Sequence, residues 1–131
     1  MISVAELEGI AAARLSDAET LRTAGRFDGA TYLCGYAVEI ALKARICRAL
    51  DWAAFPSTAH EFQAYRSFQT HDLVVLLRLS GQESRIQEQH FELWSQVASW
   101  RPEFRYNAVG STRAATAAAM IEAAGRLLER L

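Results

Sequence analysis

The chain has 131 residues, of which 51% are hydrophobic and 22% are charged, and its formal net charge is −1. This length predicts one domain with a substantial buried core, and the composition excludes a disordered or low-complexity protein. Because the net charge is near zero, broad electrostatic capture of nucleic acid or of an anionic membrane is not expected, although a local basic patch is compatible with it. No apolar run is long enough for a membrane span, and no basic segment followed by an apolar one opens the chain. We therefore expect a cytoplasmic protein with no membrane partner.

The first half of the chain predicts two long helices. Apolar residues recur at helical spacing over residues 3–24, and Ser3 followed by Glu6 is a capping-box pattern. The glycine that follows is expected to end this helix. The second helix is expected to begin at residues 26–28 and to end near Leu50, and its almost wholly apolar surface predicts a central place in a bundle. Its two cysteines lie too far apart along one helix to form a disulfide, so both are predicted to be free thiols.

The second half predicts a packed loop and shorter helices. The aromatic residues of 51–70 predict a packed loop with one short helical turn rather than a flexible linker. Three further helices are expected: one from near Asp72 to Gly81, one from about Glu83 to Trp100 that Pro102 stops, and one from a cap at Ser111 to Leu131. Strand patterns are nearly absent. The prediction is a single all-α domain over residues 1–131, an up-and-down bundle of about five helices.

Four polar residues form a stripe on the otherwise apolar second helix. At about 100° per residue, Tyr32, Tyr36, Glu39 and Lys43 lie within an arc of roughly 60°. Two interpretations stay open. Glu39 and Lys43 form a surface ion pair, or they belong to a partly buried network in which Arg14, on the apolar face of the first helix, reaches Glu39. A buried Arg14 would need such a partner, because an unpaired buried charge is costly. Alternatively, Arg14 extends its charged end to solvent.

Several motifs resemble the HEPN (higher eukaryotes and prokaryotes nucleotide-binding) family, and together they span nearly the whole chain. They are Arg-Leu-x-Asp-Ala at 14–18, a glycine turn with an aromatic residue and Asp28, Gly-Tyr-Ala-x-Glu-x-x-Leu-Lys at 35–43, Thr-His-Asp-Leu at 70–73, and Arg-Tyr at 105–106. The resemblance implies a helical bundle that is commonly homodimeric. It also implies a role in toxin–antitoxin systems or beside a small nucleotidyltransferase.

Ribonuclease members of that family use an arginine followed four to six residues later by a histidine, the first to stabilise charge on phosphate and the second for proton transfer. This spacing occurs at Arg66–His71 and at Arg85–His90, and about one such match is expected by chance in so arginine-rich a chain. Arg85 and His90 are the better pair because their segment is predicted to be helical. However, Ile86 stands where active members usually have a polar residue, and no histidine precedes the last helix.

The leading hypothesis is a non-catalytic or weakly catalytic protein that binds a nucleotide or RNA in a polar groove. Its predicted residues are Tyr36, Glu39, Lys43, His71, Arg105 and Tyr106, with Arg14 supporting Glu39. Lys43 and Arg105 are expected to contact phosphate oxygens, and Tyr106 to stack on the ligand or to hydrogen-bond with it.

Other assignments stay open beside this hypothesis. Trp94, Trp100, Phe104 and Tyr106 either stack on bases beside Arg101 and Arg105 or belong to the core. His71 is either a structural residue at a helix start or a ligand contact. The alternatives for the whole chain are a metal-independent endoribonuclease toxin and a purely structural helical interaction module. No metal-ligand spacing is present, and no cofactor is expected.

Overall fold

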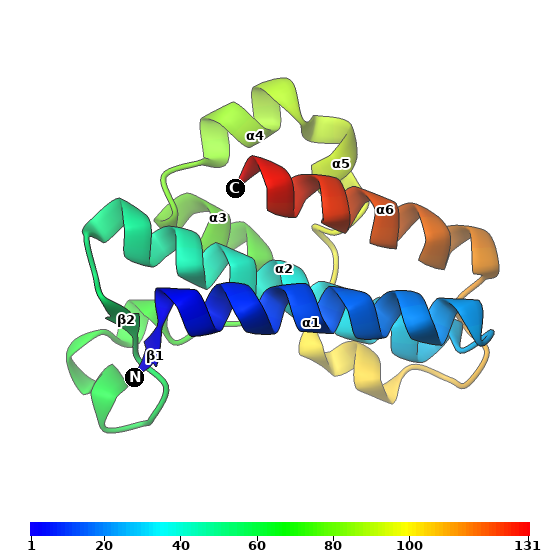
Figure 1. Ribbon diagram of the computed structural model, residues 1–131, viewed down its shortest axis with the longest axis horizontal. Helices are drawn as coiled ribbons and strands as arrows, with labels where there is room; N and C mark the ends of the chain where they lie inside the picture. Colours follow the sequence, from blue (N-terminus) through cyan, green and yellow to red (C-terminus); the bar gives the residue numbers. More distant parts are fainter.

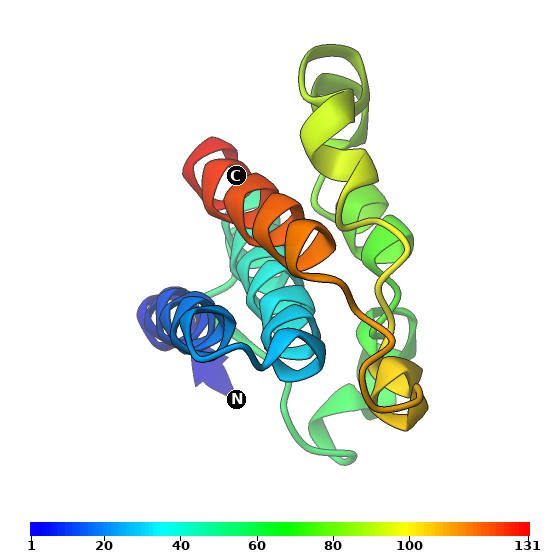
Figure 2. The ribbon, with the colours of Figure 1, turned by 90° about the vertical axis from the view of Figure 1, so that its right-hand side faces the viewer.

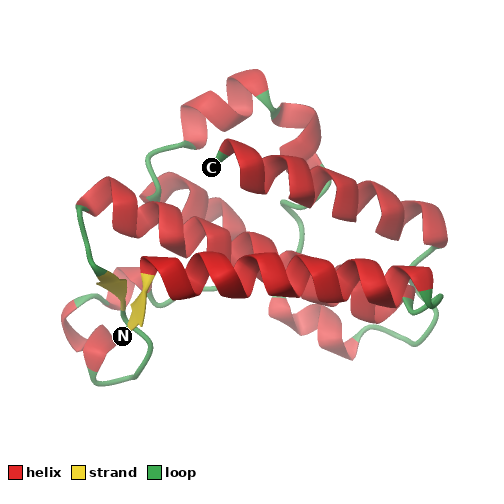
Figure 3. Ribbon diagram, viewed as in Figure 1, coloured by secondary structure: helices red, strands yellow, loops and turns green.

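The computed structural model describes all 131 residues, and helices make up most of the chain (Figures 1 and 3). The long helices are α1 (Val4–Thr23), α2 (Phe27–Leu50) and α6 (Ala114–Arg130). The short ones are α3 (Leu73–Leu79), α4 (Glu83–Gln89), α5 (Phe91–Ser95) and the 3₁₀ helices η1 (Glu61–Ala64), η2 (Arg66–Phe68) and η3 (Pro102–Tyr106). The all-α prediction is confirmed. No helix is both long and apolar enough to cross a membrane.

The boundaries of α1 and α2 follow from local chemistry. The Ser3 hydroxyl accepts a hydrogen bond from the Glu6 amide, and the Glu6 carboxylate accepts one from the Ser3 amide, so the predicted capping box is confirmed. Gly25 adopts a φ of +77°, and the Arg26 amide donates to the Leu21 carbonyl at 2.8 Å. This left-handed turn, which favours glycine, ends α1 and lets α2 begin at once.

Helix α2 is the centre of the bundle. It packs against α1 on one side, against α6 on another and against α3 on a third, as the end-on view shows (Figure 2). Its buried residues include Cys34 and Cys47, which are free thiols as predicted. Burial raises the pKa of both thiols, that of Cys34 to about 12.

The helix predicted over residues 83–100 is broken in the structure. Helix α4 ends at His90, α5 ends at Ser95, and the chain then turns tightly, with the Val97 amide donating to the Trp94 carbonyl and the Trp100 amide to the Val97 carbonyl, both at 3.0 Å. Bonds of this i→i+3 type bring every third side chain onto one side. Trp94, Val97 and Trp100 are all buried along this segment. The split accounts for a sixth α-helix.

The start of α6 also differs from the prediction. Ser111 does not cap this helix; Arg113 is the N-cap residue, and its side chain makes no capping hydrogen bond. The Asp28 carboxylate instead accepts hydrogen bonds from the Gly110 and Thr112 amides just before the helix.

The loop after α2 is packed, as predicted, and it contains two 3₁₀ turns rather than one helical turn. The ring of Trp52 lies 4.9 Å from that of Tyr65 and 5.0 Å from that of Phe68, centroid to centroid. A short antiparallel pair that the sequence did not predict, β1 (Ile2–Ser3) and β2 (Ala54–Phe55), ties this loop to the start of α1.

Candidate functional site

The polar stripe of α2 contains a buried ionic cluster. The Glu39 side chain is almost wholly buried, and the residue is only 2% exposed. Its Oε1 accepts a hydrogen bond from Lys43 Nζ at 2.7 Å and lies 2.9 Å from His71 Nδ1. Its Oε2 is buried without a hydrogen-bond partner. Neither interpretation describes this arrangement fully: the Glu39–Lys43 pair is buried and not on the surface, but its third member is His71, just before α3, and not Arg14.

Arg14 is not part of that cluster. Its guanidinium pairs with Asp17 at 3.0 Å on the same helix, and its side chain is 42% exposed. The prediction that Arg14 supports Glu39 is wrong, because Asp17, one turn away, already offers a carboxylate near solvent, and His71 and Lys43 occupy Glu39.

Lys43 and His71 differ in how much they offer to a ligand. The Lys43 side chain is 16% exposed, its amine is committed to Glu39, and it lies 5.6 Å from the centroid of the Phe55 ring. A contact between Lys43 and phosphate would therefore have to use the remaining donors of a largely buried amine. The His71 side chain is 61% exposed, and only its Nδ1 is engaged. Its Nε2 makes no hydrogen bond within the protein, and His71 lines a cavity of about 590 Å³ together with Arg101 and Glu103.

Tyr36 connects this cluster to a group of aromatic side chains. Its ring lies 5.2 Å from that of Tyr32 and 4.8 Å from that of Trp100, both edge-on. The two tyrosine hydroxyls are 3.4 Å apart. Burial, above all, raises the pKa of Tyr36 to about 12, and the Tyr32 hydroxyl adds to this effect. Tyr36 is thus a packed residue that stays neutral, and it does not present an ionisable group to a ligand.

Trp100 sits directly on the backbone of α2 at Gly35. A Cβ atom at Gly35 would lie 2.1 Å from the indole atoms Cδ2 and Cε2. Only glycine permits this approach, which gives the Gly-Tyr-Ala motif a packing role. The Trp100 indole is buried and its Nε1 has no hydrogen-bond partner. Trp94 is also buried, so these two residues belong to the core rather than to an exposed stacking surface.

Arg105 and Tyr106 form the exposed part of the predicted groove. The Arg105 guanidinium lies 4.7 Å from the centroid of the Tyr106 ring, and its Nη1 donates to the Pro102 carbonyl at 3.1 Å. The pKa of Arg105 is raised mainly by a hydrogen bond with Tyr106, and Tyr32 adds to this effect. Tyr106 itself is 77% exposed. An arginine held against an open tyrosine ring is suited to contact an anion beside a planar group.

A second cavity lies next to this pair. Its volume is about 480 Å³, and it is lined by the first turn of α2, by η3 and by the residues that lead into α6. Tyr32, Trp100 and Arg105 are in its walls. Both cavities share Trp100 in their linings. Of the six residues predicted to form one groove, Arg105 lines this second cavity and His71 lines the other, and neither cavity contains Tyr36, Glu39, Lys43 or Tyr106.

Asp28 holds the segment between η3 and α6 in place. Its carboxylate accepts hydrogen bonds from the Gly110 amide at 2.6 Å and the Thr112 amide at 2.9 Å. These two amides lower its pKa below the ordinary aspartate value. Sequence reasoning placed Asp28 only at the start of α2 and missed this role. The sequence features that could have suggested this contact are the acidic Asp28 in the first turn of a helix and Gly110 in a distant loop.

The two arginine–histidine pairs that the ribonuclease spacing suggested, Arg85–His90 and Arg66–His71, do not form a common site in the structure. Arg85 donates to Gln82 Oε1 at 2.9 Å and to the Arg130 carbonyl at 2.5 Å, at the end of α6. His90 terminates α4, about 140° further around the helix at 100° per residue. Arg66 is in η2. The structure does not bring either Arg85 or His90 to the residues around Trp100.

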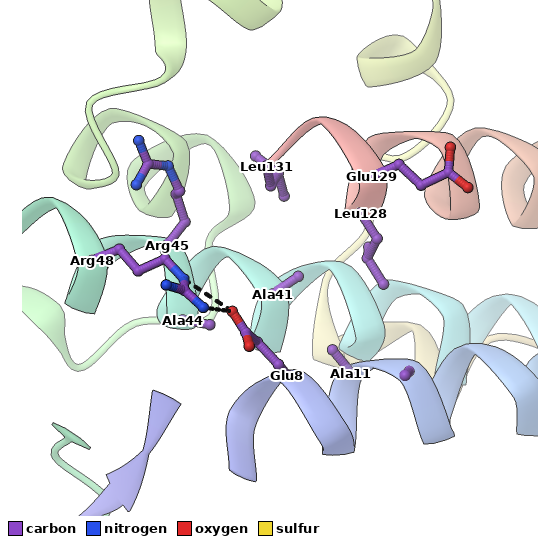
Figure 4. A pocket seen from close by; sticks show the side chains of 10 residues that line it. Glu8, Ala11, Ala41, Ala44, Arg45, Arg48, Leu128, Glu129 and Leu131 are labelled. Carbon is purple, nitrogen blue, oxygen red and sulfur yellow. Dashed lines mark hydrogen bonds and ion pairs between the residues drawn. The ribbon is translucent and has the colours of Figure 1, made fainter. Parts of the chain in front are cut away.

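Another pocket, of about 300 Å³, lies between α1, α2 and the end of α6 (Figure 4). Alanines such as Ala11 and Ala44 form much of its lining, and Arg48 crosses from α2 to Glu8 of α1 at 3.0 Å from its Nε. This pocket contains none of the predicted site residues. No group of three potential ligands among His, Cys, Asp and Glu side chains is placed to hold a metal ion.

Comparisons with protein-family models, with curated proteins and with solved structures find no match to this chain.

Proposed function

We propose that this chain is a HEPN-like, non-catalytic or weakly catalytic protein that binds a nucleotide or RNA as one component of a toxin–antitoxin or nucleotidyltransferase-associated pair. The observation that carries the binding proposal is the Arg105 guanidinium held 4.7 Å from the exposed ring of Tyr106, beside a cavity of about 480 Å³. Arginine binds phosphate oxygens through a planar fork of donors, and an open tyrosine ring is a platform for a base.

The local charge supports this proposal. The segment 101–113 contains three arginines and one acidic residue, whereas the whole chain has a net charge of −1. Arg101, Arg105 and Arg113 are all exposed. A small basic patch of this kind attracts an anionic ligand locally without giving the entire protein a basic surface.

The buried cluster has a supporting role in the proposed site. Glu39 and Lys43 neutralise each other inside the protein, and Glu39 orients His71 through Nδ1. Tyr36 and Trp100 pack edge-on against each other, with their ring centroids 4.8 Å apart. We assign these residues to positioning, and we assign direct contact with the ligand to Arg105, Tyr106 and the free Nε2 of His71.

The endoribonuclease alternative has less support from the geometry. Arg85, its proposed phosphate-binding residue, already donates to Gln82 and to the end of α6. His90 shares no contact with it.

A titration with a fluorescently labelled single-stranded RNA tests the binding proposal. Arg105→Ala and Tyr106→Ala are each expected to weaken binding by about tenfold or more, since stacking on one aromatic side chain contributes roughly 1–3 kcal/mol per base. Added salt should weaken binding by the wild-type protein, and less so by Arg105→Ala. Arg126→Ala, which removes an exposed arginine from α6, is the matched control and should bind as the wild type does. If wild-type protein binds neither RNA nor nucleotides at low salt, the proposal is wrong.

The partner is part of the same proposal, and its support is the sequence resemblance. We propose a homodimer or a complex with a small nucleotidyltransferase. Light scattering on the purified chain distinguishes a dimer from the 14.6 kDa monomer. A monomer at every concentration would reject the homodimer.

A further inference from the structure

The cavity beside Arg105 has aromatic walls of suitable size for a planar ligand. Its volume of about 480 Å³ is within the usual range of small-molecule sites, roughly 300–1,000 Å³. Tyr32, Trp100 and Phe104 all line it. Phe104 is partly exposed at the surface, and its ring and that of Tyr32 can accept an apolar, planar group, whereas Trp100 is buried and contributes only to the wall.

Several polar side chains that line the same cavity form no hydrogen bond within the protein. Gln96, Asn107 and Thr116 line it, are exposed, and form no side-chain hydrogen bond with another residue. The side-chain amides of Gln96 and Asn107 each offer two hydrogen-bond donors and an acceptor, and the Thr116 hydroxyl can donate or accept a hydrogen bond. This combination matches the edge of a nucleobase, which carries donors and acceptors side by side, better than it matches a phosphate, which only accepts.

The two charged residues of the lining set the orientation of such a ligand. They are Asp28 and Arg105. Amides at the starts of α2 and α6 would otherwise attract an anion. The Asp28 carboxylate already accepts hydrogen bonds from the Gly110 and Thr112 amides and brings its own negative charge to that wall. A phosphate is therefore disfavoured near Asp28 and favoured near Arg105.

We infer that this cavity takes one unpaired base of a single-stranded nucleic acid, with the adjoining phosphate on Arg105 and a neighbouring base on Tyr106. The inference rests on the proposed binding function and specifies its ligand. A base within a duplex has its pairing edge occupied, and extracting it costs a few kcal/mol of stacking and pairing. The site accordingly selects single strands over duplexes.

Binding of three matched RNAs by wild-type protein tests this inference. The probes are a single-stranded hexamer, the blunt duplex of the same sequence, and a hexamer of abasic ribose phosphates. The single strand is expected to bind at least about tenfold more tightly than either of the others, because only it can supply a free base. A fluorescent adenine analogue in the single strand should be quenched on binding, as stacking against the aromatic walls requires.

Variants of the polar lining complete the test. Gln96→Ala and Asn107→Ala are each expected to weaken binding of the single strand several-fold and to leave binding of the abasic strand unchanged, since that strand has no base edge. Gln87→Ala, an exposed glutamine on α4, is the control and should have no effect.

The outcomes separate this inference from the binding proposal beneath it. Equal affinity for single strand, duplex and abasic strand, with Arg105→Ala still harmful, would overturn the base-binding cavity and leave RNA binding standing. Unchanged single-strand affinity in both Gln96→Ala and Asn107→Ala would also overturn it. If none of the probes binds, both proposals fail.

Discussion

At the scale of single residues, Gly35 is the glycine with the least space for a side chain, because Trp100 packs against the α2 backbone there. The indole occupies the space in which any other residue would place its Cβ. Trp100 also forms a wall of both cavities of the candidate site. The smallest possible change at Gly35 therefore tests packing and site geometry together.

Gly35→Ala is expected to destabilise the protein and to displace Trp100. Its methyl group would lie 2.1 Å from indole atoms, and overpacking of a close-packed core typically costs about 1–3 kcal/mol. Urea unfolding monitored by circular dichroism measures the change, and a shift in tryptophan fluorescence reports displacement of the indole.

Gly9→Ala provides the matched control for that substitution. Gly9 is within α1, is exposed, and a Cβ there would meet nothing within 4 Å. Alanine favours a helix interior by about 0.5–1 kcal/mol over glycine, so this variant should be more stable than the wild type. Equal effects of the two substitutions would contradict the proposed packing of Trp100.

Residue-level prediction from the sequence succeeded where neighbours along one helix decide the outcome. Glu39 and Lys43 are four residues apart, and their pairing follows from helical spacing. Arg14 was assigned to the wrong partner because the distance between two helices and the nearness of Asp17 depend on tertiary packing. Trp100 over Gly35 joins positions 65 residues apart, and no local pattern shows such a contact.

At the scale of elements, Asp28 in the first turn of α2 holds the segment that leads into α6 in place through its two hydrogen bonds. Asp28→Asn should loosen that segment, because a neutral amide oxygen is a weaker acceptor for the Gly110 and Thr112 amides than a carboxylate is. Hydrogen exchange measured by mass spectrometry is expected to be faster over residues 107–113 and unchanged in α1. Glu88→Gln, an exposed residue of α4, should leave the exchange of this segment as it is in the wild type.

The elements themselves were predicted unevenly. The start of α1 is marked by the Ser3–Glu6 capping box, and its end and the start of α2 are marked by Gly25, so the sequence predicted these boundaries correctly. The break at His90 has no proline or glycine to mark it. After the break, the chain buries Trp94, Val97 and Trp100 through i→i+3 turns, which local propensity does not reveal. The cap of α6 was misassigned for a similar reason, since its supporting residue is in a distant helix.

At the scale of the whole molecule, perturbed carboxyl and hydroxyl groups set the pH range of stability. The Met1 ammonium, above all, lowers the pKa of Glu61 to about 2, and amide hydrogen bonds lower that of Asp28. In the unfolded chain these groups bind protons at their ordinary values of 4.5 and 3.8. Between the folded and unfolded values the unfolded state binds more protons, so stability falls as the pH drops below 4.5.

The alkaline side follows from the opposite shifts. Burial raises the pKa of Cys34 from 9.0 to about 12 and that of Tyr36 from 10.0 to about 12. The folded state thus keeps protons that the unfolded state releases, and this contribution to stability, complete below pH 9.0, is lost as the pH rises toward 12. Urea midpoints measured across the acid and alkaline ranges should decline at both ends. Glu61→Gln should weaken the acid decline, and an acid limb identical to that of the wild type would contradict the role of Glu61.

The arginine-rich segment is fastened at both of its ends, by Trp100 in the notch at Gly35 and by Asp28 on the Gly110 and Thr112 amides. A loop that is held at both ends can have its middle part exchanged without changing the positions of its ends. Residues 103–109 are all exposed and can be replaced by other sequences of equal length with little effect on the packing of the bundle, because Trp100, the buried Pro102 and the Gly110 and Thr112 amides lie outside the exchanged stretch. The scaffold is consequently a suitable acceptor for grafted recognition loops, and selection from a library of such loops can alter the ligand while α1, α2 and α6 stay constant.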